Sequence, residues 1–141
     1  MTELLTDPVV RRTVLVLGVL ALVSGLGTLT LGLAEGQELL AERGVRLGTL
    51  MHLNPLGSLV TIALAGVTIG AALARSRVLL LGASGGWLVA VAQTIAQSGR
   101  DPNVLGGTAS TLAFFLAMAA SLAAIGLTPA GDRSAGGEHE P

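Results

Sequence analysis

The sequence predicts an all-α membrane protein, a four-transmembrane-helix bundle with both termini in the cytoplasm. A short extracytoplasmic amphipathic segment is expected between the first and second helices. Composition is the first reason: hydrophobic residues make up 51% of the 141 residues, charged residues make up 12%, and the mean hydropathy is +0.74. A soluble domain carries about 25% charged residues. The other reasons are the lengths of the apolar runs and the positions of the arginines.

Four apolar runs are long enough to cross a bilayer, which takes about 20 residues in a helix. The expected spans are residues 13–33, 55–74, 78–97 and 105–127, within a single domain of residues 1–127. None of these runs contains Asp, Glu, Lys, Arg or His. Residues 128–141, TPAGDRSAGGEHEP, are expected to form a disordered polar tail in the cytoplasm.

Three dipeptides predict where helices begin. Asp7-Pro8, Asn54-Pro55 and Asp101-Pro102 each place a capping side chain directly before a proline. Asp and Asn accept hydrogen bonds from the free N–H groups of a first helical turn, and proline suits the first helical position. The sequence therefore predicts helix starts after residues 7, 54 and 101.

The arginines predict the orientation, because loops on the cytoplasmic side are enriched in basic residues. Five of the eight fall on the side of the termini and three on the other, which favours cytoplasmic termini in a bacterial inner membrane. The larger group is Arg11, Arg12, Arg75, Arg77 and Arg133, and the smaller is Arg43, Arg46 and Arg100.

The first span has a second interpretation. Arg11-Arg12 precede the apolar run and Gly32-Leu33-Ala34 ends it, which is the pattern of a cleaved signal peptide, including the twin-arginine kind. The run of about 21 residues is longer than the apolar region of most signal peptides, which is about 7–15 residues. A retained membrane span is therefore the favoured interpretation.

Small residues recur at helical spacing in all four runs. Such stripes let helix backbones approach each other closely in a membrane, and GxxxG is their best-known form. The sequence therefore predicts a close-packed bundle. The residues expected at its helix contacts are Gly18, Ala21, Gly25, Thr28 and Gly32, then Ala63, Gly66, Gly70 and Ala74, then Gly82 and Gly86, and last Gly106, Ala109, Ala113, Ala117, Ala120 and Ala124.

Polar and aromatic side chains in the third run are expected to fasten it to its neighbours. Gln93 and Gln97 continue the stripe of Gly82, so their amides can hydrogen-bond to another helix near the end of the span. Trp87 lies near the middle of the run, which predicts core packing, with its indole N–H donating to a hydroxyl or carbonyl of another helix.

The segment between the first two spans, AEGQELLAERGVRLGTLMHLNP, is the most polar region beside the predicted membrane. Glu35, Glu38 and Glu42 share one face at helical spacing, which predicts a short amphipathic helix lying on the bilayer surface. A docking surface for an extracytoplasmic partner is the alternative. We expect no metal or cofactor, because His52 and these carboxylates match no metal-binding motif. The candidate polar site on this side comprises Glu35, His52, Gln97 and Arg100.

With this order of spans and the segment LMHLNP, the chain resembles the uncharacterised small four-helix inner-membrane proteins common in high-GC bacteria. The resemblance covers residues 10–127 and concerns architecture only. It implies a multi-pass inner-membrane protein, and it implies no site residues.

The sequence narrows the function classes. Without Cys or Lys the chain has no thiolate or Schiff-base chemistry, and its net charge of −1 gives no reason to expect nucleic-acid binding. We expect a non-catalytic accessory or scaffolding subunit that associates with another membrane protein or with itself. One alternative is a small oligomeric transporter or channel with Gln93, Thr94 and Gln97 at its mouth. The other is a lipid- or quinone-binding protein that uses Trp87, Gln97 and Arg100.

Overall fold

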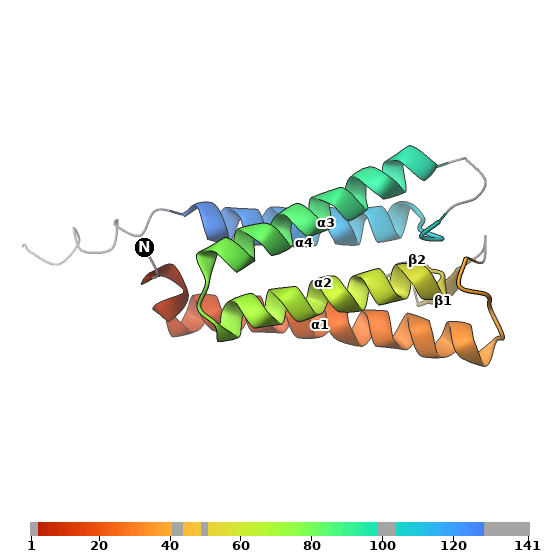
Figure 1. Ribbon diagram of the computed structural model, residues 1–141, viewed down its shortest axis with the longest axis horizontal. Helices are drawn as coiled ribbons and strands as arrows, with labels where there is room; N and C mark the ends of the chain where they lie inside the picture. Colours follow the sequence, from red (N-terminus) through yellow and green to blue (C-terminus); the bar gives the residue numbers. More distant parts are fainter. Residues whose placement is uncertain (1–2, 41–43, 49–50, 99–103, 129–141) are drawn as a thin grey trace, which may run out of the picture.

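The computed structural model describes residues 3–40, 44–48, 51–98 and 104–128. In this part of the chain, four long helices account for most residues (Figure 1). All four are long and apolar enough to cross a membrane, which indicates a multi-pass membrane protein. The elements in order are a 3-10 turn η1 (Glu3–Thr6), α1 (Pro8–Ala34), β1 (Val45–Leu47), β2 (Met51–Leu53), α2 (Pro55–Leu73), α3 (Arg77–Gln97) and α4 (Ala109–Leu127).

The helices form two antiparallel pairs, α1 with α2 and α3 with α4 (Figure 1). The pairs join mainly through α2 and α3, whereas α1 and α4 scarcely touch. We call the end that carries β1 and β2 the hairpin end. There α1 and α3 finish and α2 and α4 begin, and η1 and the last turn of α4 lie at the opposite end.

Two of the three predicted helix starts are confirmed. Asp7 precedes α1 and its Oδ1 accepts a hydrogen bond from the N–H of Val9 at 2.8 Å. Asn54 precedes α2 and its Oδ1 accepts one from the N–H of Gly57, also at 2.8 Å. In both helices proline takes the first position, as its fixed φ angle favours.

The predicted start of the fourth helix is wrong. Asp101 and Pro102 lie outside the described residues, but residues 104–108 are not helical and α4 begins only at Ala109. Gly106 has a φ angle of +61°, a left-handed conformation that a right-handed helix cannot contain. The backbone of Leu105 instead accepts a hydrogen bond from the N–H of Asn54 at 3.2 Å, so this segment packs against the start of α2.

The amphipathic helix expected between the first two spans is also wrong for the residues described. Residues 35–40 contain two turns, and β1 and β2 then pair as an antiparallel hairpin. Gly36 and Gly48 have φ angles of +68° and +57°, which interrupt any helix there. In β2, Met51 and Leu53 are buried on either side of the half-buried His52, the alternation expected of a strand with one face on a core.

The stripe predicted for the first helix is confirmed, because all five of its small residues are buried. Gly18 and Gly25 are where α1 approaches α2 most closely. A Cβ atom on Gly25 would lie 2.9 Å from Cγ1 of Ile62 and 3.2 Å from the carbonyl oxygen of Ser58. Glycine therefore sets the spacing of this helix pair, as small residues do in membrane bundles.

Buried hydroxyl groups link neighbouring helices. Ser58 of α2 donates to Oγ1 of Thr28 in α1 at 2.8 Å, and Ser84 of α3 donates to the carbonyl oxygen of Ala119 in α4 at 2.9 Å. A hydroxyl in an apolar interior is costly without a partner, so each pair also restrains the rotation of one helix against the next.

All three aromatic side chains of the protein meet in the centre of the bundle. Trp87 is fully buried, with ring centroids 5.4 Å from Phe115 and 6.2 Å from Phe114. Its indole Nε1 donates to Oγ1 of Thr68 in α2 at 3.3 Å. This confirms the predicted core role of Trp87 and its bond to a hydroxyl of another helix.

The turn between α2 and α3 gives the first testable prediction. Arg75 has a φ angle of +51°, and the N–H of Ser76 bonds back to the carbonyl oxygen of Ala71 at 3.0 Å, as in a glycine-terminated helix end. Replacing Arg75 with Gly removes the left-handed strain and is expected to raise the free energy of unfolding by about 1 kcal/mol. Titration with denaturing detergent in mixed micelles measures this. Arg75→Ala removes the same charge but keeps the strain, and an equal gain in that variant would contradict the explanation.

Candidate functional site

The hairpin end contains a buried hydrogen-bond network centred on Asn54. This side chain is fully buried, and besides capping α2 it donates from Nδ2 to the carbonyl oxygen of Val104 at 2.8 Å. Its backbone N–H donates to Leu105. One asparagine thus connects the start of α2 to the loop that precedes α4.

The same network reaches α3 and the hairpin. Oε1 of Gln97, the last residue of α3, accepts a hydrogen bond from the N–H of Val104 at 2.8 Å. Oγ1 of Thr111 in α4 accepts from the N–H of His52 at 3.0 Å and donates to its carbonyl oxygen at 2.9 Å. These bonds hold β2, α2, α3 and α4 in one arrangement at this end.

Gln93, expected from its sequence position to fasten α3, makes no hydrogen bond to another helix among the described residues. Its side chain is exposed on the outside of the bundle. The neighbouring Thr94 is buried and bonds to the carbonyl oxygen of Ala90 in its own helix at 2.8 Å. Thr94 and Gln97 are both engaged in bonds within the chain, so the structure does not bring the three side chains together around a mouth.

Most of the predicted packing residues of α2 and α3 also face outward. A Cβ atom added to Gly66, Gly70 or Gly82 would meet nothing within 4 Å. Only Gly86 is in contact, because a Cβ there would lie 2.6 Å from Cδ2 of Leu64. Within the single chain, neither GxxxG pair therefore forms a helix contact with both of its glycines.

The alanine stripe of α4 lies on the outer surface as well. Ala109, Ala113 and Ala117 are exposed, together with Ala120 and Ala124. The opposite side of α4 carries the large side chains Phe115, Met118 and Leu122, which are buried in the core on the side that packs against α3. Large side chains fill the space around Trp87, and that leaves the small ones outside.

The remaining candidate polar residues do not form one cluster. Glu35 and Glu38 are exposed in the segment after α1, and Arg100 and Glu42 lie outside the described residues. No group of three or more metal-ligating side chains occurs in the described ranges. Trp87, which the alternative of a lipid- or quinone-binding protein would use, is fully buried in the single chain.

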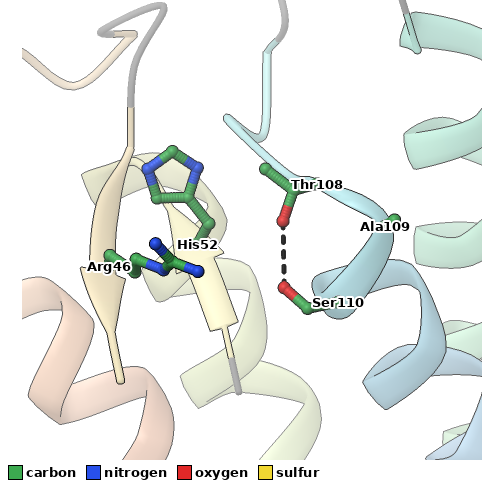
Figure 2. Close-up of a pocket in the computed structure, with 5 residues that line it drawn as sticks. All are labelled: Arg46, His52, Thr108, Ala109 and Ser110. Atoms are coloured by element: carbon green, nitrogen blue, oxygen red, sulfur yellow. Dashed lines mark hydrogen bonds between the residues drawn. The ribbon is translucent and has the colours of Figure 1, made fainter. Parts of the chain in front are cut away.

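A half-open depression of about 430 Å³ lies between the hairpin and the start of α4 (Figure 2). Of its two basic side chains, His52 was predicted from sequence as a site residue at this end and Arg46 was not. Strand pairing places the two directly opposite each other, a relation that appears only once the hairpin is known. The residues that line the depression are Arg46, His52, Thr108, Ala109 and Ser110.

Two surface features of the described bundle therefore have functional potential. One is the alanine face of α4, and the other is the depression beside Arg46 and His52. Comparisons of the chain with models of known protein families, with curated proteins and with solved structures give no match.

Proposed function

We propose that this protein is a non-catalytic accessory or scaffolding subunit of a bacterial inner-membrane assembly, and that it binds a neighbouring membrane helix through the outer face of α4. The observation that carries the proposal is the exposure of Ala109, Ala113 and Ala117 along one face of a helix apolar enough to span a membrane. The neighbouring helix belongs to a second copy or to another membrane protein.

The contrast between α1 and α4 supports this assignment. The outward face of α1 carries large branched side chains, which suit contact with lipid chains. The outward face of α4 is mostly alanine, and small side chains allow another helix backbone to approach closely enough for extensive van der Waals contact. The exposed large residues of α1 are Val16, Val19, Leu20, Val23 and Leu26.

Gln93 gives a second line of support. It is exposed on α3 about one turn before that helix ends, at a depth where water is scarce if the helix spans the membrane. An amide in that position gains by bonding to another protein helix, typically by about 0.6 kcal/mol and by up to about 2 kcal/mol. Gly66, Gly70 and Gly82, where an added Cβ atom would meet nothing within 4 Å, offer further places where a second helix could approach α2 or α3.

The proposed orientation places both termini in the cytoplasm. By sequence position, five of the eight arginines fall on the side of the termini and three on the side of the hairpin. Because basic residues near span ends are retained on the cytoplasmic side, this asymmetry supports an extracytoplasmic hairpin.

Enlarging the alanine face tests the proposal. In the double variant Ala113→Leu/Ala117→Leu, the added side chains keep the surface apolar but prevent close approach of a neighbouring helix. We expect the native chain to leave its membrane in a stoichiometric complex, and the double variant to leave it as a single chain. Native mass spectrometry after gentle extraction measures both states.

The control places two leucines on the outward face of α1 instead, Val19→Leu/Val23→Leu, and should leave the complex intact. Loss of the complex in this control as well would show that association does not use α4 specifically. A native chain that is always extracted alone would overturn the proposed function.

A further inference from the structure

The depression beside the hairpin is lined by hydrogen-bond donors. Arg46 lies directly opposite His52 in the antiparallel pairing, and side chains at such positions project from the same face of the two strands. Figure 2 shows both beside the gap that separates the hairpin from Thr108 and Ser110. Among the described residues, no carboxylate lines the depression.

Neither of these two side chains is engaged within the described part of the chain. The Arg46 guanidinium makes no hydrogen bond or ion pair there, and the bonds of His52 to Thr111 involve only its backbone. A guanidinium presents several N–H donors in a planar fork that matches the oxygens of phosphate or carboxylate. These two side chains are therefore available to a ligand.

The start of α4 adds donors to the opposite wall. The helix leaves the N–H groups of its first turn without acceptors in the helix, and they carry partial positive charge. Thr108 does not cap them with its side chain, because its Oγ1 is paired with Oγ of Ser110 at 3.0 Å. Those two hydroxyls also remain within the lining of the depression.

We propose that this depression binds a phosphate group, held by Arg46 and His52 on one wall and by the first turn of α4 on the other. A tetrahedral anion with several acceptor oxygens satisfies donors that converge from two walls better than a planar carboxylate does. The volume of about 430 Å³ exceeds what a bare ion needs, and the bundle end is where lipid headgroups lie if the helices span a membrane. The phosphate belongs either to a phospholipid headgroup or to a small soluble ion, and the two are distinguished below.

The test uses the full chain in uncharged detergent micelles at constant ionic strength. One arm titrates inorganic phosphate and follows the backbone amide NMR signals of Ala109 and Ser110. The other arm adds phosphatidic acid, with diacylglycerol as the matched lipid that lacks the phosphate, and counts bound lipid by native mass spectrometry. Saturable shifts with inorganic phosphate indicate a soluble ligand. Retention of phosphatidic acid over diacylglycerol without such shifts indicates a lipid headgroup.

Substitution of Arg46 identifies the site. Arg46→Gln is expected to weaken phosphate binding about tenfold, because it removes a charge-assisted hydrogen bond. The side chain of Arg46 is exposed, and an unchanged circular dichroism spectrum verifies that the variant folds. Arg12→Gln removes the same charge at the opposite end and should bind like the native chain.

Three results would overturn the proposal. The first is equal retention of diacylglycerol and phosphatidic acid without any phosphate-dependent shift of the amide signals. The second is an equal weakening of phosphate binding by Arg12→Gln and Arg46→Gln. The third is phosphate binding that Arg46→Gln leaves unchanged. His52→Gln gives an independent check. It keeps the backbone bonds to Thr111, so weaker phosphate binding in that variant reports on the ring itself.

Discussion

Replacing Gly57 with Ala is expected to lower the free energy of unfolding by about 2–3 kcal/mol, because two backbone segments meet at this residue. A Cβ atom on Gly57 would lie 2.5 Å from the carbonyl oxygen of Leu105 and 2.9 Å from Cδ2 of Leu53. The carbonyl belongs to the loop that is hydrogen-bonded to Asn54, so it cannot move aside without breaking that network. Denaturing-detergent titration in micelles measures the loss.

Gly66→Ala is the matched control in the same helix. A Cβ atom there would meet nothing within 4 Å, and alanine is a better helix former than glycine by up to about 1 kcal/mol. This variant should therefore be as stable as the native chain or more so. If both variants changed stability equally, the close approach of the 104–108 loop to α2 would be contradicted.

Replacing Asn54 with Ala is expected to cost about 3 kcal/mol, the second large effect at the same end. The substitution removes the cap of α2 and leaves the N–H of Gly57 and the carbonyl oxygen of Val104 without their bonds to this side chain. Both bonds are at least partly shielded from solvent, so water compensates poorly for their loss. The same titration provides the measurement.

Two further variants separate the cap from the bond to the loop. Asn54→Ser keeps a hydroxyl that can cap the helix but lacks the Nδ2 donor, so an intermediate loss is expected. Asp7→Ala removes a cap from the exposed start of α1, where about 1 kcal/mol is typical. A loss in Asn54→Ala no greater than in Asp7→Ala would show that the bond between Asn54 and Val104 contributes nothing.

The positions of the helices could be predicted from sequence because local signals determine them. Each helix is specified by an apolar run of sufficient length. Its ends are specified within a few residues, by the Asp7-Pro8 and Asn54-Pro55 starts and by charged or glycine-containing turns. The start of α4 was placed too early because residues 104–108 take their conformation from Asn54, about fifty residues earlier in the chain. A bond between such distant residues leaves no local pattern.

The candidate sites depended on distant contacts as well. Glu35, Glu38 and Glu42 have helical spacing, but Gly36 and Gly48 adopt left-handed conformations that interrupt a helix in this segment. Only the hairpin brings Arg46 opposite His52, and only the packing of β2 against α4 brings that pair to the first turn of the helix. The sequence therefore gives no sign that Arg46 lines the depression.

The sequence by itself determined that four helices form, where most of them begin, and which residues share a face of each helix. Only the tertiary structure decided which face of each helix turns inward. A helix in water reveals its inner face by being apolar there, but these helices are apolar all round, so hydrophobicity assigns no direction. The shapes of the side chains determine the inner face instead. Glycines allow α1 to pack closely against α2, whereas the cluster of three aromatic rings buries the large side chains of α4 and leaves its alanines exposed.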